Sequence, residues 1–338
     1  MSDHYVSLKH ITLAYGDTVA IPSLDLDIRE GELIALLGPS GCGKTTTMRA
    51  IAGLMPVQSG TIQIDGRNVT RVAANKRGIG LVFQSYALFP HLSAFENAAF
   101  GLRLKRLSQS EVSARTNEGL AIVGLSELAD RKPAEMSGGQ QQRLALARSL
   151  VMKPKVLLLD EPLSNLDARL RIELRTELQR IQKDTGVTMV FVTHDQSEAL
   201  ALADRIVLMR DGSIEQLGTP EELYNFPNTT FAAQFMGFDN LFEVSNKSLS
   251  NQHGELPLHY DTQASFLAWR PTGVEVGQGP YTGSVSSVAF AGQHREYTLE
   301  TALGTLKADT PVGIQEFAIG TTVNFDLPQS TARTLSSR

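Results

Sequence analysis

The stretch of sequence that decides the fold is LIALLGPSGCGKT, residues 33–45. It opens with an unbroken apolar run, which is typical of a strand buried on both faces of a parallel sheet. The segment that follows, Gly38–Thr45, matches the pattern G-x-x-x-x-G-K-[ST] in full, and its glycines let backbone N–H groups turn inward toward phosphate oxygens. A helix is expected to begin near Lys44, and its N-terminus adds positive potential. The stretch therefore predicts an α/β fold with a phosphate-binding loop.

The side chains of this loop have separate expected roles. Lys44 is expected to reach the β- and γ-phosphates of a nucleoside triphosphate, and the Thr45 hydroxyl is expected to bind Mg²⁺. A glycine-rich turn that fits the pattern by chance is the alternative, but the flanking strand and helix favour a phosphate loop. The residues expected to bind the nucleotide here are Gly38, Pro39, Ser40, Gly41, Cys42, Gly43, Lys44, Thr45 and Thr46.

A second apolar run ends in two carboxylates. Residues 156–161 read VLLLDE, and in an α/β sheet ligands gather at the carboxyl ends of the strands. Asp160 is expected to hold Mg²⁺, directly or through water, and Glu161 is expected to orient or deprotonate the attacking water. The alternative is a solvated strand end with two ordinary acids, and the phosphate loop upstream weakens it.

Two further apolar runs end in a polar side chain. Gln84 follows residues 81–83, and His194 follows residues 191–193. A lone histidine is more often structural than catalytic, but the ends of parallel strands lie at the same edge of a sheet. Three strand ends are therefore expected to present polar side chains to the region where a γ-phosphate would lie.

The composition limits the possible partners. The chain has 338 residues, which suits two domains, and a net charge of −5, which gives no basic field for nucleic acid. Its one cysteine, Cys42, cannot form an internal disulfide, which fits a reducing compartment. No apolar run approaches the ~20 residues of a membrane-spanning helix, and the N-terminus has no apolar signal core. We therefore expect a chain that does not span a membrane itself and binds no nucleic acid.

The pattern along the chain predicts two domains. Residues 1–236 alternate apolar runs with amphipathic helical stretches, which indicates a largely parallel α/β sheet. Within them, residues 87–152 lack strong strand runs and are interpreted as an inserted helical subdomain. From 237 to 338, short alternating stretches between turn residues predict a small all-β domain. The strands expected in the first domain are residues 33–37, 80–83, 156–159 and 189–193, and the expected helices are residues 108–123, 139–152 and 166–183.

The helix expected at 139–152 begins in an unusual way, within MSGGQQQRLALARSL. Ser137 and Gln140 form the S-x-x-Q pattern of a capping box, so a well-capped helix start is one interpretation. A cap does not need the two glycines between them, which weaken the first helical turn. Glycines let a backbone approach a ligand closely, and a helix N-terminus attracts anions. Two arginines of this helix, Arg143 and Arg148, add positive charge, although exposed arginines usually only solvate a face.

Together these motifs resemble those of the ATPase subunit of an ATP-binding-cassette (ABC) transporter, over nearly the whole chain. The family's phosphate loop corresponds to Gly38–Thr45, its Walker B strand and catalytic glutamate to Val156–Glu161, and its switch histidine to His194. The other correspondences are the Q-loop glutamine at Gln84, the adenine-stacking aromatic at Tyr15, the signature at Met136-Ser137-Gly138-Gly139-Gln140 and the D-loop at Ser164-Asn165-Leu166-Asp167. The signature usually reads LSGGQ, and methionine for leucine is a volume-conserving change. The resemblance implies a P-loop NTPase fold.

The resemblance also implies a role for each of these residues in ATP hydrolysis. Its catalytic residues are Glu161, His194 and Gln84, and its Mg²⁺ ligands are Thr45, Gln84 and Asp160. The signature of one subunit would contact the γ-phosphate held by the phosphate loop of another, through Ser137, Gly138, Gly139 and Gln140. Two copies of the chain would then enclose two ATP molecules as a homodimer.

The resemblance further implies membrane partners. The aromatic-rich residues 83–100 correspond to the region that receives a coupling helix of a transmembrane subunit, although some of these side chains must be core. Weaker matches at residues 268–271, 283–285 and 297–299 resemble the TOBE-like, OB-like β domain of importers. We therefore expect a peripheral protein on the cytoplasmic face of the membrane, with two permease subunits and, indirectly, an extracytoplasmic solute-binding protein.

The expected function is thus the energy-coupling ATPase of an ABC importer for a polyamine, ferric iron, sulfate or phosphonate. A sugar importer is the first alternative, but the C-terminal domain is compact for one. A soluble ABC ATPase acting on ribosomes or DNA is less favoured, because those usually carry two cassettes or a long coiled-coil insertion. A P-loop kinase would leave the signature and His194 unexplained.

Overall fold

The computed structural model describes residues 4–335, which divide into two compact units between Pro220 and Glu221. In the first unit a sheet has the strand order β10-β9-β3-β8-β7-β6. All neighbouring strands in it are parallel except β10 and β9. Their bounds are β3 (Leu33–Leu37), β6 (Ile79–Val82), β7 (Val156–Asp160), β8 (Thr188–Thr193), β9 (Arg205–Arg210) and β10 (Ser213–Gly218).

The predicted strands agree closely with this sheet. β3 has the predicted bounds, and β7 and β8 each extend the prediction by one residue. β6 begins and ends one residue earlier than predicted, because its pairing with β7 ends at Val82. Phe83, the predicted last residue, is 38% exposed. The buried strands are apolar on both faces because both faces are covered.

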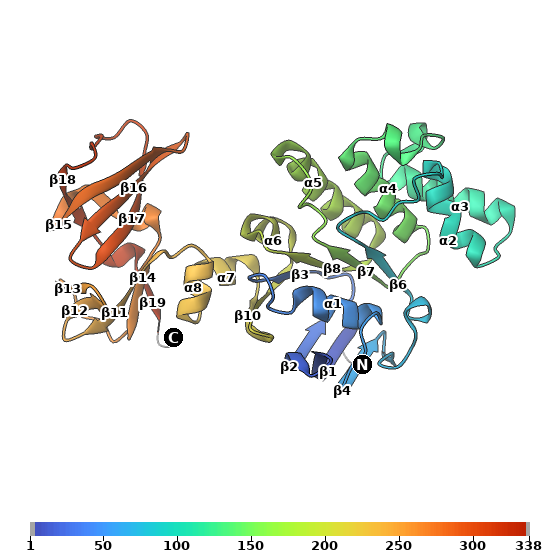
Figure 1. Cartoon of the computed structure of the whole chain (residues 1–338), viewed down its shortest axis with the longest axis horizontal. Helices are drawn as coiled ribbons and strands as arrows, with labels where there is room; N and C mark the ends of the chain where they lie inside the picture. The colour runs from blue at the N-terminus through green and yellow to red at the C-terminus, as the bar shows by residue number, and fades with distance from the viewer. Residues whose placement is uncertain (1–3, 336–338) are drawn as a thin grey trace. The chain divides into compact units, whose positions relative to one another are not determined.

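A second sheet, which the sequence analysis did not predict, covers one face of the first. It has the order β2-β1-β4-β5 and is antiparallel. Helix α1 (Lys44–Ala52) lies between the two sheets (Figure 1), and the residues of all three pack into one hydrophobic core. The bounds of its strands are β1 (Val6–Tyr15), β2 (Thr18–Ile28), β4 (Ser59–Ile64) and β5 (Arg67–Asn68). The core fixes α1, and with it the phosphate loop, against the parallel sheet.

The remaining helices of the first unit fall into two groups. Between β6 and β7 the chain forms α2 (Ala94–Leu104), α3 (Gln109–Ile122) and α4 (Gly138–Leu150). The predicted helices coincide with α3 and α4 within one or two residues, whereas α2 was not predicted. After β7 come α5 (Ala168–Thr185) and α6 (Gln196–Leu202), on the face of the parallel sheet opposite to α1 (Figure 1).

The second unit begins with two short helices and continues as antiparallel sheets. The helices are α7 (Pro220–Asn225) and α8 (Thr230–Phe235). The sheets have the orders β13-β12-β11-β14-β19 and β17-β16-β15-β18 and share one hydrophobic core around Trp269. Their strands are β11 (Asn240–Ser245), β12 (Ser248–Asn251), β13 (Gly254–Pro257), β14 (Phe266–Trp269), β15 (Glu275–Phe290), β16 (His294–Thr301), β17 (Gly304–Pro311), β18 (Thr322–Asp326) and β19 (Arg333–Leu335). An α/β core followed by a small all-β domain is the predicted fold class, which is thus confirmed.

Arg270 explains why α7 and α8 belong to the second unit rather than to the first domain, where the sequence analysis places them. Its guanidinium lies 3.6 Å from the ring centroid of Tyr224 and 4.1 Å from that of Phe238. It also donates hydrogen bonds to the carbonyls of Tyr224 and Met236. The predicted boundary after residue 236 stays a prediction. Within residues 4–335, no helix is long and apolar enough to cross a membrane.

Candidate active site

The phosphate loop joins the end of β3 to the start of α1, and two of its glycines are required by the backbone. Gly38 and Gly43 have φ angles of 151° and 104°, a region that side chains disfavour. A Cβ on Gly38 would collide with the carbonyl oxygen of Met209, and one on Gly43 with the side chain of Ile21. Gly43 is also the N-cap of α1 and brings no capping side chain. The N–H groups at the start of α1 therefore have no side-chain acceptor at the cap.

Lys44 is held inside the loop. Its Nζ donates hydrogen bonds to the carbonyl oxygens of Gly38 at 2.7 Å and Pro39 at 2.8 Å, and the residue is 6% exposed. The Cys42 sulfur lies 3.8 Å from the same nitrogen. Burial raises the pKa of the Cys42 thiol, so this thiol stays protonated near neutral pH. The loop thus holds one buried cation against two of its own backbone carbonyl oxygens.

Thr45 and Asp160 bring two oxygens together beside the loop. The Thr45 hydroxyl donates a hydrogen bond of 3.3 Å to Oδ1 of Asp160, which ends β7. Burial raises the pKa of Asp160, although the Thr45 hydrogen bond and the charge of Arg49 oppose the shift. A hydroxyl and a carboxylate are the hard oxygen ligands that Mg²⁺ prefers, so this pair fits a magnesium site.

Glu161 lies where three parallel strand ends meet. Gln84, just beyond β6, donates from Nε2 to Oε2 of Glu161 at 3.3 Å. His194, just beyond β8, places Nδ1 3.4 Å from Oε1 of the same carboxylate. Glu161 itself has a φ of 45°, a left-handed conformation that is uncommon for a residue with a side chain. The expected convergence of Gln84, Glu161 and His194 is therefore present in the structure.

Gln84 has further contacts with the predicted D-loop. Its side-chain Nε2 donates to Oγ of Ser164 at 3.1 Å, and its backbone carbonyl oxygen accepts a 3.0 Å hydrogen bond from Asn165 Nδ2. Among the described residues, nothing donates a hydrogen bond to the amide oxygen of Gln84. That oxygen is the atom with which Gln84 can bind a cation.

Tyr15 ends β1 and presents an exposed ring beside the phosphate loop. The residue is 52% exposed, and its hydroxyl lies 3.3 Å from Oγ1 of Thr46. An exposed aromatic ring next to a phosphate loop provides a surface on which a base can stack. The position agrees with the role that the resemblance implies.

The signature residues form the predicted capping box at the start of α4. Ser137 Oγ accepts a hydrogen bond from the Gln140 amide at 3.3 Å, and Gln140 Oε1 accepts one from the Ser137 amide at 3.0 Å. Neither Gly138 nor Gly139 has a positive φ, and a Cβ on either would make only ordinary contacts, at 3.9 and 3.5 Å. The fold of this chain therefore does not require glycine at either position. Among residues 4–335, no hydrogen bond joins the signature to the phosphate loop.

Two polar side chains of α4 that the sequence analysis did not assign to the site donate hydrogen bonds to the backbone segments that carry Glu161 and Gln84. Gln142, fully buried, donates a hydrogen bond to the carbonyl of Pro162, next to Glu161. Arg148 donates to the carbonyls of Tyr86 and Ala87, close to Gln84. Only Gln142 left a signal in the sequence, since it lies one turn before the apolar Leu146 on the buried face of the helix.

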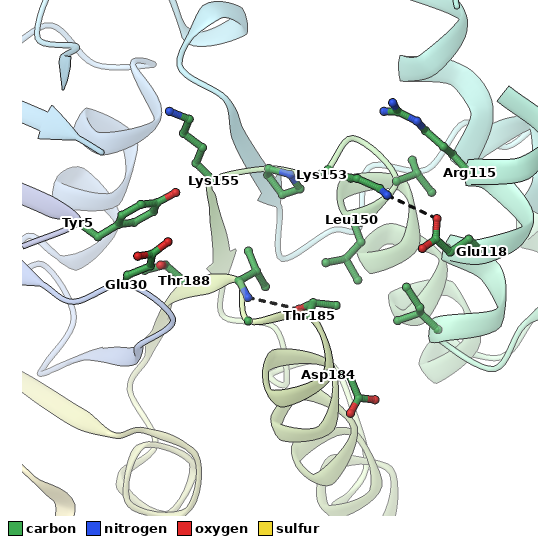
Figure 2. Close-up of a pocket in the computed structure, with 16 residues that line it drawn as sticks. Tyr5, Glu30, Arg115, Glu118, Leu150, Lys153, Lys155, Asp184, Thr185 and Thr188 are labelled. Atoms are coloured by element: carbon green, nitrogen blue, oxygen red, sulfur yellow. Dashed lines mark hydrogen bonds and ion pairs between the residues drawn. The ribbon is translucent and has the colours of Figure 1, made fainter. Parts of the chain in front are cut away.

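A cavity of about 380 Å³ lies at the opposite ends of the strands, beside the starts of β7 and β8 (Figure 2). None of the predicted site residues lines it. The cations on its wall already have carboxylate partners: Lys153 lies 3.7 Å from Glu118, and Lys155 lies 2.5 Å from Asp65. Arg115 is paired with Glu111 in the same way. The cavity is therefore not the nucleotide site.

The fold and the site together define a P-loop nucleoside triphosphatase. The family model for ABC transporters matches residues 21–164. The Fe(3+) ions import ATP-binding protein FbpC of Rhizobium etli is 46% identical over 343 residues, which cover 98% of this chain and 94% of that protein. The chain belongs to the ABC transporter family, as an ATP-hydrolysing subunit.

Other relatives and solved structures agree with this assignment. An FbpC protein of Rhizobium meliloti is 47% identical over 89% of both chains. The spermidine/putrescine import ATP-binding protein PotA of Aggregatibacter actinomycetemcomitans is 48% identical over 78% of this chain and 74% of its own. The structure of cbiO1 from Clostridium perfringens has a TM-score of 0.63 and 31% identity, over 67% of this chain and 92% of that chain. The dimeric cassette MJ0796 has a TM-score of 0.57 and 33% identity, over 64% and 98%.

Proposed function

We propose that this chain is the ATPase subunit of an ABC importer and that it hydrolyses ATP at the site around Glu161. The observation that carries the proposal is the meeting of Gln84, Glu161 and His194 beside a complete phosphate loop. Relatives that match nearly the whole chain are described as import ATP-binding proteins. Their description supports import rather than a soluble role.

The residues of this site have distinct roles in the proposed reaction. Lys44 and the backbone donors of the loop bind the phosphates, and Tyr15 stacks on the adenine. Glu161 accepts the proton of the attacking water. His194 and Gln84 orient the Glu161 carboxylate through the contacts described above. Thr45 and Asp160, with the amide oxygen of Gln84, would hold Mg²⁺, which supplies charge neutralisation on the phosphates.

We also propose that the chain works as a homodimer in which the signature of one copy binds the nucleotide of the other. The support is Gly138 and Gly139, which the fold of a single chain does not require. Glycine at these positions costs helix stability, and a bare backbone at a helix N-terminus suits an anion from outside the chain. The MJ0796 cassette, which is described as dimeric, is consistent with this arrangement.

Ser137→Arg tests the shared site. The arginine side chain is much larger than that of serine and would block the approach of a second copy's nucleotide. We therefore expect hydrolysis to be lost while ATP binding to the monomer is retained. Loss of the cap alone costs about 1 kcal/mol of stability. Ser108→Arg is the matched control, because Ser108 caps α3 through the Glu111 amide in the same way. Normal turnover by a Ser137→Arg homodimer would contradict the proposal.

The surface near Gln84 supports docking of transmembrane subunits. Phe83 and Phe100 are each 38% exposed, and Leu104, one turn after Phe100 on α2, is 71% exposed. The Phe89 ring packs on Phe100 with centroids 4.5 Å apart. Exposed apolar side chains on one helix face favour contact with a partner. We propose that two permease subunits bind there and keep the ATPase at the cytoplasmic face of the membrane, with a solute-binding protein acting through them.

The proposed cargo is ferric iron, with a polyamine as the second candidate. Ferric-iron relatives match up to 98% of this chain, whereas the spermidine/putrescine relative matches 78% of it at similar identity. The two kinds of relative therefore differ mainly in how much of this chain they match, and hardly in percentage identity. Neither cargo touches this chain directly, since the solute-binding protein and the permeases select it.

Uptake measurements in a strain lacking this gene test the cargo. We expect uptake of radiolabelled ferric iron to be lost and spermidine uptake to be unchanged. The wild-type gene should restore iron uptake, and a Glu161→Gln gene should not, because transport needs hydrolysis. The opposite pattern would assign a polyamine cargo, and unchanged uptake of both solutes would contradict this part of the proposal.

A further inference from the structure

The Q-loop, the segment from Phe83 to Ala87 that carries Gln84, contains two strained residues in a row. Tyr86 and Ala87 have φ angles of 61° and 50°, in the left-handed region. A bulky residue such as Tyr86 is a marked outlier there, and such conformations persist only where the surroundings hold them in place. The Ala87 amide donates to the Ser85 carbonyl at 2.6 Å and the Tyr86 amide to the Phe83 carbonyl at 2.9 Å. These local bonds tighten the turn but do not tie it to another element.

Asn165 and Ser164 bind Gln84 itself, whereas Arg148, in the last turn of α4, binds the two strained residues that follow it. Its Nη1 donates to the carbonyl oxygen of Ala87 at 2.6 Å and its Nη2 to that of Tyr86 at 3.0 Å. The planar guanidinium thus bridges two successive carbonyls, which a single ammonium does not match. The guanidinium also lies 5.8 Å from the ring centroid of Phe89. Burial lowers the pKa of Arg148, but an arginine stays charged at any physiological pH.

Helix α4 connects this tie to the signature. The helix begins at the Ser137 cap and ends at Leu150, so Ser137 and Arg148 are carried by one rigid element about 20 Å long. In its second turn, Gln142 donates a hydrogen bond to the carbonyl of Pro162, next to Glu161. The helix that begins at the signature is therefore hydrogen-bonded both to the Q-loop and to the residue next to Glu161.

We infer that Arg148 is a positioning residue for Gln84: by holding the strained Q-loop it sets the contact between Gln84 and Glu161 and couples it to the signature. The inference rests on the proposed function, in which Gln84 takes part in hydrolysis. It differs from a simple charge effect of an arginine near a helix C-terminus, because that effect would need no particular partner.

The test is a double-mutant cycle in the full-length protein, with Arg148→Ala, Gln84→Ala and the double variant. For Arg148→Ala we expect kcat for ATP hydrolysis to fall about 10- to 100-fold. The KM for ATP should stay within about twofold, because the phosphate loop is untouched. The double variant should be no slower than the slower single variant, since both changes remove the same placement of Gln84. Effects that multiply would show that Arg148 acts elsewhere and would overturn the inference.

Two further variants make the test specific. Arg148→Lys keeps the charge but not the two-pronged contact, so we expect it to be nearly as slow as Arg148→Ala; full activity would overturn the inference. If Arg148→Ala does not fold, Arg148→Lys replaces it in the double-mutant cycle. Arg143→Ala is the matched control, because Arg143 lies on the same helix and has no hydrogen bond or ion pair among the described residues.

The outcomes separate this inference from the proposed function. If the wild-type protein hydrolyses no ATP, the proposed function fails. If it does, but Gln84→Ala is as fast as the wild type, then Arg148 does not act through Gln84 and the inference fails alone.

Discussion

Glu161→Gln is expected to reduce ATP hydrolysis about 100- to 10,000-fold, which is the usual contribution of a general base. The substitution keeps the shape of the side chain and its ability to bond to Gln84 and His194, but an amide cannot accept the proton of the attacking water. Neither Lys44 nor the glycines of the phosphate loop are changed, so the affinity for ATP should be retained. With binding intact and hydrolysis blocked, the homodimer should accumulate with ATP bound.

Steady-state hydrolysis, ATP titration and size-exclusion chromatography with ATP measure these three effects. Glu127→Gln is the matched control, because Glu127 is an exposed carboxylate in the helical region with no ion pair among the described residues. Hydrolysis by Glu161→Gln at the normal rate would mean that another group takes the proton. An inactive variant that also fails to bind ATP would point instead to a damaged fold.

The parts of the site that the sequence predicts best are those in which a local motif meets a simple rule of topology. Gly38–Thr45 is recognisable by itself, because the positive φ of Gly38 and Gly43 leaves few other residues that fit. Gln84, Glu161 and His194 are far apart in the chain, but each follows an apolar strand. The ends of neighbouring parallel strands lie at one edge of a sheet, so their meeting was predictable without any contact being known.

The antiparallel sheet and α2 were not predicted, for different reasons. In β1 the alternation of buried and exposed residues is interrupted by irregular pairing with β2 between Leu8 and Ala14, which breaks the period of two on which strand prediction relies. For α2 a signal was present: Ser93 and Glu96 form a capping box. The aromatic side chains of residues 83–100 fit a docking surface as well as a helix, so they do not by themselves indicate α2.

The role of Arg148 was not predictable from the sequence. The sequence indicates only that Arg148 adds positive charge to the helix or solvates one of its faces. Its partners are the carbonyls of Tyr86 and Ala87, about 60 residues away in the chain, and a backbone carbonyl leaves no mark in the sequence. For Gln142 the helical spacing indicates burial, but its partner, the carbonyl of Pro162, is equally unmarked in the sequence. Positioning contacts of this kind depend on how α4 packs, which only the structure defines.

Lys44→Ala is expected to weaken ATP binding about 10- to 100-fold, because a charge-assisted hydrogen bond to a phosphate contributes about 1.5–3 kcal/mol. The ammonium is buried and already points into the loop, so little ordering is needed when the phosphates arrive. Removing it also leaves the carbonyls of Gly38 and Pro39 without this donor, so thermal unfolding must be followed alongside calorimetric titration of ATP. Lys76→Ala, at an exposed position, is the control. An unchanged dissociation constant in a folded Lys44→Ala protein would place the triphosphate outside this loop and contradict the proposed site.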